Sequence, residues 1–142
     1  MANTKEAGIH TLTGKCLCGA VQYEVADAFE YAANCHCSDC RRATGSAFKP
    51  FAGIRREKFA LTAGADNLLI YGDETASHDA RCRLCGSYLY SVVRENAWVH
   101  VVMGTLVDAP TIRPDHHIFV GSKAPWFTIT DGLPQHREFP PR

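Results

Sequence analysis

The cysteines constrain this chain more than any other feature, because all seven fall into three tight groups. The groups hold two, three and two residues: Cys16, Cys18, Cys35, Cys37, Cys40, Cys82 and Cys85. An odd number of closely grouped thiols suits metal ligation better than a framework of disulfides. We therefore expect a domain that is cross-linked by bound metal ions.

The first and third groups are each followed directly by a glycine, Gly19 and Gly86. Glycine lets the backbone turn tightly around a metal and aim its N–H groups at thiolate sulfur. Two such hairpins supply four sulfur ligands, and a tetrahedral zinc site closed by four protein ligands is structural. We predict that one structural zinc ion is held by Cys16, Cys18, Cys82 and Cys85.

The central group then keeps three thiols, Cys35, Cys37 and Cys40, the number of protein ligands in a catalytic zinc site with an open fourth position. The alternative is a second closed site, and sulfur ligands also accept iron. The side chains that could close such a site are His36, His78, His100, His116, His117, Asp39 and Glu74. We expect His36 to be packed instead, because in an extended segment it points away from its two cysteine neighbours.

A short helix is predicted directly after the second thiol of the central group, with Ser38 as its cap and Gly45 as its end. Cys40 then lies in the first turn, where backbone N–H groups and the helix dipole favour thiolate, so we expect a lowered pKa. Arg41 and Arg42 follow, and cations beside a thiolate-rich site would attract an anionic substrate. Arg41 is the preferred candidate for a substrate or supporting contact.

The rest of the chain predicts short strands separated by turns. Val21, Tyr23 and Val25 alternate with polar residues, the pattern of a strand with one buried face. The segments 88–93 and 97–103 have strand composition and hairpin spacing, so we expect them at the centre of the core. About eight strands and one short helix predict a mainly β fold.

Length and charge narrow the class of protein further. A chain of 142 residues indicates a single domain, which we place at residues 9–142 after a flexible tail at residues 1–8. Lys plus Arg and Asp plus Glu each total 15, so no net field favours nucleic acid. The sequence contains no apolar run near the ~20 residues of a membrane span and no secretory signal, and we expect a cytoplasmic protein.

Three motifs and two closing segments carry a resemblance that spans nearly the whole chain. The motifs are Gly14-x-Cys16-x-Cys18-Gly19-x-Val21-x-Tyr23, Cys35-His36-Cys37-x-x-Cys40-Arg41 and Cys82-x-x-Cys85-Gly86. The closing segments are Gly121-Ser122-Lys123-Ala124-Pro125-Trp126 and Asp131-Gly132-Leu133-Pro134. Together they resemble the glutathione-dependent formaldehyde-activating enzyme and centromere protein V family.

The resemblance implies an Mss4-like fold of several small antiparallel sheets and two zinc ions per chain. The second zinc, on Cys35, Cys37 and Cys40, would be the catalytic one. It also implies a carbon–sulfur lyase similar to S-(hydroxymethyl)glutathione synthase, with glutathione as co-substrate and formaldehyde or a related small aldehyde as its partner. Since the Mss4-like fold also serves in protein interactions, a non-enzymatic zinc-stapled binding module is the alternative function.

Overall fold

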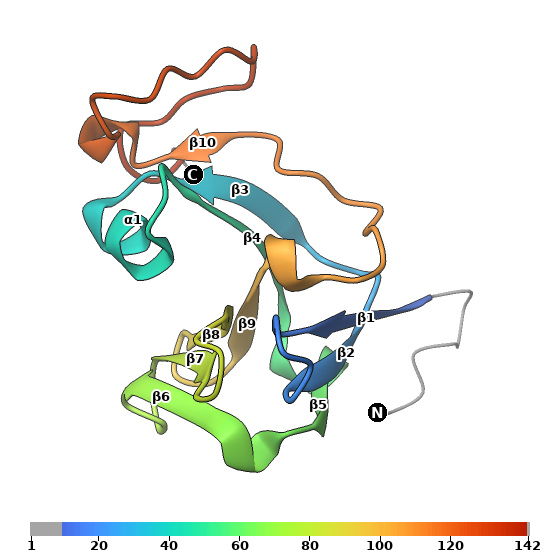
Figure 1. Cartoon of the computed structure of the whole chain (residues 1–142). Coiled ribbons are helices and arrows are strands. Elements are labelled where there is room, and N and C mark those ends of the chain that lie inside the picture. Colours follow the sequence, from blue (N-terminus) through green and yellow to red (C-terminus); the bar gives the residue numbers. More distant parts are fainter. Residues whose placement is uncertain (1–9, 142) are drawn as a thin grey trace.

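The computed structural model describes residues 10–141, and the predicted tail at residues 1–8 lies outside the described residues. In the described part, the chain forms ten β-strands and one α-helix (Figure 1). The prediction of a mainly β fold with one short helix is confirmed, with two strands more than expected. Among the described residues, no helix is long and apolar enough to cross a membrane. The cytoplasmic location stays a prediction.

The smaller of the two sheets is antiparallel and has the order β1-β2-β5. Its strands are β1 (Thr11–Lys15), β2 (Gln22–Ala26) and β5 (Phe59–Ala63). Tyr23 and Val25 on β2 are buried, whereas Gln22 between the turn and Tyr23 is exposed. The alternation read from the sequence therefore does give β2 one face toward the core.

The larger sheet has seven strands in the order β10-β3-β4-β9-β8-β7-β6. The strands are β3 (Tyr31–Cys35), β4 (Lys49–Arg55), β6 (Leu68–Gly72), β7 (His78–Cys82), β8 (Tyr88–Val93), β9 (Trp98–Val102) and β10 (His117–Ile118). All neighbours are antiparallel except β10, which pairs in parallel with β3 because the chain returns across the molecule before entering the sheet (Figure 1). The described residues thus form one antiparallel sheet and one mixed sheet, in which β10 and β3 are the parallel pair.

The main apolar core joins the two sheets. Val25 on β2, Leu89 on β8 and Val101 on β9 are fully buried in one cluster. Burying a side chain of this size contributes roughly 1.5–3 kcal/mol. The predicted position of the segments 88–93 and 97–103 at the centre of the core is confirmed.

The helix α1 (Ser38–Thr44) begins one residue earlier than the predicted cap implied. Its N-cap is Cys37, whose Sγ accepts a hydrogen bond of 3.2 Å from the backbone N–H of Cys40, so the prediction of Ser38 as cap is wrong. The thiol of Cys37 takes the place of the usual hydroxyl or carboxylate. Gly45 ends the helix in the left-handed region with φ of 64°, as predicted.

Short 3-10 turns connect several strands and contribute no buried residue. They are Arg56–Lys58, Ala65–Asn67, Met103–Thr105 and Val120–Ser122. The segment after the last turn hydrogen-bonds back to β10 and its neighbours: the backbone N–H of His117 donates to the carbonyl of Pro134, and that of Phe119 to Glu138. The end of the described chain is thereby held against the edge formed by β10 and β3.

Candidate functional site

The first cysteine cluster brings together two hairpins whose nearest ligands in sequence, Cys18 and Cys82, are 64 residues apart. The ligand atoms of Cys16, Cys18, Cys82 and Cys85 all lie within 4.8 Å of one another. The sulfur of Cys18 is 3.7 Å from that of Cys16 and 3.8 Å from that of Cys82. Four Zn–S bonds of about 2.3 Å in a tetrahedron separate the sulfurs by about 3.8 Å, so these residues fit zinc.

The backbone around this cluster donates hydrogen bonds to the sulfur atoms and turns tightly beside them. The N–H of Val21 donates to Cys16 Sγ at 3.3 Å, and the N–H of Leu84 donates to Cys82 Sγ at 3.4 Å. Gly19 and Gly86 adopt φ of 82° and 81°, a conformation that side chains rarely permit. Tight glycine turns therefore close both hairpins, which explains the glycine that follows each cysteine pair.

The second cluster sits where β3 ends and α1 begins. The sulfurs of Cys35, Cys37 and Cys40 lie within 4.8 Å of one another. Across residues 10–141, no fourth histidine, cysteine or carboxylate donor joins this group. All seven cysteines are free thiols, so both clusters retain their sulfur atoms as potential ligands. Three sulfurs fit a tetrahedral zinc ion with one position left for another ligand.

Contacts among the three thiols are the main cause of the pKa shifts of Cys37 and Cys40. Hydrogen bonds from the Cys35 and Cys40 thiols, helped by backbone N–H groups, lower the pKa of Cys37 to about 2. The same thiol contacts with Cys35 and Cys37 raise the pKa of Cys40. The prediction of a lowered pKa for Cys40 is wrong, because these thiol contacts raise it and the backbone N–H of Cys40 donates to the sulfur of Cys37.

The histidines considered as fourth ligands have other partners. His36 is fully buried and its Nε2 lies 2.8 Å from His117 Nδ1, while His117 Nε2 lies 3.0 Å from a carboxylate oxygen of Asp131. His100 Nε2 lies 2.6 Å from the hydroxyl of Tyr31. The expectation that His36 is packed is met. Among the described residues, the remaining candidates also stand outside the second cluster: His78, His116, Asp39 and Glu74.

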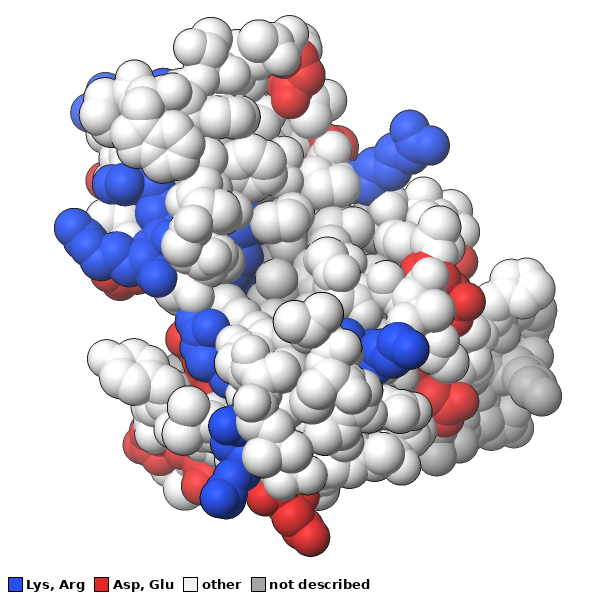
Figure 2. Space-filling view, in the orientation of Figure 1, with Lys and Arg blue, Asp and Glu red and all other residues white. Residues whose placement is uncertain are grey.

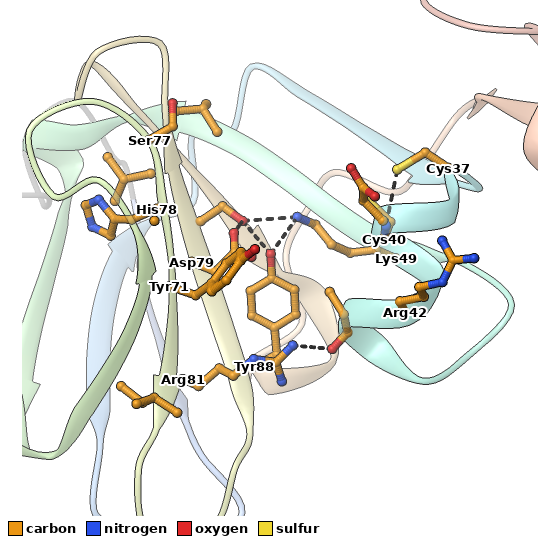
Figure 3. A pocket seen from close by; sticks show the side chains of 17 residues that line it. Cys37, Cys40, Arg42, Lys49, Tyr71, Ser77, His78, Asp79, Arg81 and Tyr88 are labelled. Carbon is orange, nitrogen blue, oxygen red and sulfur yellow. Dashed lines mark hydrogen bonds between the residues drawn. The ribbon is translucent and has the colours of Figure 1, made fainter.

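A cavity of about 850 Å³ opens beside the second cluster. Cys37 and Cys40 form part of its wall, and β6, β7 and β8 form the facing side (Figure 3). Basic side chains gather near α1 on the face that Figure 2 shows. Arg42 lines the cavity, whereas Arg41 is not among its lining residues and its Nε is buried without a hydrogen-bond partner. The role of Arg41 stays a prediction.

The cavity wall also contains a buried polar network that none of the sequence motifs indicated. Lys49 is only 6% exposed, and its Nζ donates hydrogen bonds of 3.1 Å to the hydroxyls of Tyr88 and Ser91. Ser91 Oγ donates in turn to Asp79 at 3.0 Å. Burial works against the charge of Lys49, but attraction to Tyr88, Cys40 and Asp79 outweighs it and raises the pKa of Lys49.

Arg81 joins the two sides of the cavity. Its guanidinium donates to the carbonyl of Ala43 on α1 and lies 4.5 Å from the centre of the Tyr88 ring. This contact fixes the helix that carries Cys40 against strand β7. The sequence held one signal for the network: Lys49 stands inside an otherwise apolar strand, and lysine is almost never fully buried without a partner.

The fold and the two cysteine clusters define a mainly β protein with two candidate metal sites. One site has four cysteine ligands and the other has three. The sequence model of the glutathione-dependent formaldehyde-activating enzyme family matches residues 11–122. The chain belongs to this family, and the family resemblance seen in its motifs is confirmed.

Relatives support the same assignment. A protein of Halomonas elongata is 29% identical over 136 residues, with 83% of this chain and 80% of that protein aligned. One of Fusarium vanettenii is 32% identical over 83 residues, with 57% of this chain aligned but only 45% of that protein. Both carry the name "Putative glutathione-dependent formaldehyde-activating enzyme". A crystal structure of a Rhodobacter sphaeroides protein is similar, with a TM-score of 0.58, 32% identity and coverage of 70% of this chain and 91% of that one.

Proposed function

We propose that this protein is a zinc-dependent enzyme of the carbon–sulfur lyase type, acting on glutathione and formaldehyde or on a closely related thiol and aldehyde. The observation that carries the proposal is the three-thiol cluster beside a cavity, with no fourth ligand among residues 10–141. Membership of the formaldehyde-activating family supports the choice of thiol and aldehyde.

The two clusters have different roles in this proposal. Cys16, Cys18, Cys82 and Cys85 hold a structural zinc, and residues 9–142 form one domain around it. Cys35, Cys37 and Cys40 hold the second zinc, which lowers the pKa of a coordinated thiol when it is bound. The thiolate needed for attack on an aldehyde is thereby available at neutral pH.

The cavity supplies the substrate site. Its volume of about 850 Å³ lies within the range of roughly 300–1,000 Å³ typical of small-molecule pockets. Arg42 on α1 and Arg81 on β7 line it, and no carboxylate lies within 4.0 Å of either guanidinium in the described residues. We assign them to the carboxylates of the thiol substrate, because guanidinium groups bind carboxylates in a bidentate manner.

The proposed reaction is the addition of a thiolate to the carbonyl group of an aldehyde. The thiolate sulfur attacks the aldehyde carbon, a C–S bond forms, and the electron pair of the C=O π bond moves to oxygen. That oxygen then takes up a proton to give the hydroxymethyl thioether, and cleavage is the reverse sequence.

A binding module without catalysis is the second candidate, and one observation favours it. Leu17 and Leu84 project from the two hairpins of the first cluster and are 87% and 64% exposed. Apolar side chains at such positions suit contact with a partner protein. This candidate makes no use of the cavity at the second cluster.

The deciding experiment measures adduct formation and metal coordination together. Exchange NMR with ¹³C-formaldehyde and glutathione would give the rate of S-(hydroxymethyl)glutathione formation with zinc-loaded protein and in buffer alone. We expect acceleration by the wild-type protein and none by Cys40→Ser, with folding retained in both. Two bound zinc ions, no acceleration and no change in the absorption of Co²⁺-substituted protein on adding glutathione would overturn the enzyme in favour of the binding module.

A further inference from the structure

Lys49 occupies a special position relative to the three-thiol cluster. In the antiparallel pairing of β3 and β4, Lys49 is the direct partner of Cys35. Directly opposed residues in such a pair project from the same face, with Cβ atoms about 4.5–5.5 Å apart. Lys49 also lines the cavity together with Cys37 and Cys40, as Figure 3 shows. Its ammonium group therefore faces the space beside the sulfur atoms.

The burial of this lysine is unusual, because its Nζ reaches the carboxylate of Asp79 only through Ser91 Oγ. Its Nζ lies 5.0 Å from the centre of the Tyr88 ring and 5.8 Å from that of Phe51. No carboxylate lies within 4.0 Å of Nζ among residues 10–141. Burying a charge costs several kcal/mol unless it is paired. A charged side chain held in the core without a direct ion pair, beside a cavity, is a candidate for function.

The hydrogen bonds around Lys49 leave one N–H group of its ammonium without a partner among the described residues. Ser91 uses its only O–H on Asp79, so its oxygen accepts from both Lys49 and Tyr88, which lies 2.6 Å away. Tyr88 uses its O–H on Ser91 and accepts from Lys49. The ammonium has three N–H donors, and two are held by these hydroxyls. The third has no partner in the described part of the chain.

We propose that Lys49 is a catalytic residue that binds the aldehyde oxygen through this third N–H, an inference that rests on the function proposed above. As sulfur attacks carbon, the C–S bond forms and the π electron pair becomes negative charge on that oxygen. The fixed ammonium stabilises this charge, and the alkoxide then takes a proton from solvent. Tyr88 and Ser91 position the ammonium through their hydrogen bonds to it.

The kinetic test uses a charge-neutral variant of similar length. Lys49→Met is expected to slow adduct formation by about 10²–10³-fold, the usual effect of losing one donor to a developing oxyanion. The matched control is Lys58→Met, at an exposed lysine in the 3-10 turn Arg56–Lys58, and its rate should equal that of the wild type. Lys49→Arg keeps the charge and should retain a part of the rate. Unchanged turnover in Lys49→Met overturns the proposal.

A binding test gives a readout that does not depend on turnover. Mercaptoacetate carries an anionic oxygen close to its sulfur, and 1-propanethiol has no such oxygen. Their dissociation constants follow from the charge-transfer absorption of Co²⁺-substituted protein. The wild-type protein and Lys58→Met should prefer mercaptoacetate by at least about tenfold, and Lys49→Met should lose that preference. An equal preference in Lys49→Met and wild type contradicts an oxygen-binding role.

The two measurements separate the two proposals. If the wild type shows no turnover but its preference for mercaptoacetate depends on Lys49, the enzyme proposal fails and the oxygen-binding site stands. If the wild type turns over and Lys49→Met turns over at the same rate, the enzyme proposal stands and the role proposed for Lys49 fails. If Lys49→Met unfolds or loses its second metal ion, Lys49→Arg and Tyr88→Phe replace it. If Tyr88→Phe then prefers mercaptoacetate as strongly as the wild type does and forms the adduct at the full rate, the proposal is overturned.

Discussion

His36 and His117 are joined by a hydrogen bond of 2.8 Å between Nε2 and Nδ1, although 81 residues separate them in the sequence. Asp131 accepts from His117 Nε2, so His117 Nδ1 is the acceptor for the N–H of His36. Because His36 stands between Cys35 and Cys37, this chain of partners ties the three-thiol loop to the C-terminal segment.

Replacement of His117 by leucine should therefore weaken the fold. His117→Leu leaves the N–H of buried His36 without an acceptor, and we expect a loss of about 1–3 kcal/mol in the free energy of unfolding. Urea titration of the zinc-loaded protein would measure it. The control is Asp131→Asn, which keeps an acceptor oxygen and should cost less. Equal losses in the two variants would contradict the assigned direction of the hydrogen bonds.

The two cysteine clusters should respond differently to the loss of one sulfur. Cys82 is fully buried in the main core, and the metal-binding free energy of a structural site is largely folding free energy. We expect Cys82→Ser to be unfolded or strongly destabilised, and Cys40→Ser to stay folded with one zinc ion in place of two. Circular dichroism and metal analysis give both quantities. Similar unfolding of both variants would show that the sites are structurally equivalent.

Stability should fall in acid partly because of His100. Burial, helped by the positive charges of Lys49 and Arg94, lowers the pKa of His100 to about 3. An unfolded histidine has a pKa of about 6.5, so between these values the unfolded state binds more protons and stability falls as the pH falls. The uptake of one proton on unfolding changes the free energy of unfolding by at most about 1.4 kcal/mol per pH unit. In chemical denaturation from pH 6.5 to 4.5, His100→Gln should show a shallower loss than the wild type, and parallel curves would refute this.

Gly64 should not tolerate a side chain. Its φ is 82°, and a Cβ there would meet the carbonyl oxygen of Ala20. We expect Gly64→Ala to cost about 2–3 kcal/mol in the free energy of unfolding. Gly104→Ala is the matched control, because a Cβ at Gly104 meets nothing within 4 Å, and its cost should stay below about 0.5 kcal/mol. Thermal melts compare the two, and a neutral Gly64→Ala would contradict the tight contact.

Local patterns account for most of what could be predicted about the fold. The alternation around Tyr23, the glycine after the helix and the composition of the segment 88–93 all act over a few residues, and each led to the element observed. Ser38 is not the cap of the helix, because the sulfur of Cys37 takes the place of the oxygen that usually caps. The parallel pairing of β10 with β3 could not be predicted, since a two-residue strand carries no period of its own.

The grouping of the cysteines and the family can be recognised from the sequence alone, because ligand spacing and glycine turns are properties of short segments. The surroundings of the three-thiol cluster, in contrast, depend on how distant segments pack together. Lys49 becomes its neighbour through the register of β3 and β4, and Tyr88 and Ser91 reach Lys49 from β8, about 40 residues away. Contacts of that kind depend on how strands are ordered within the sheet, and strand order is set by packing of the whole core rather than by any local pattern.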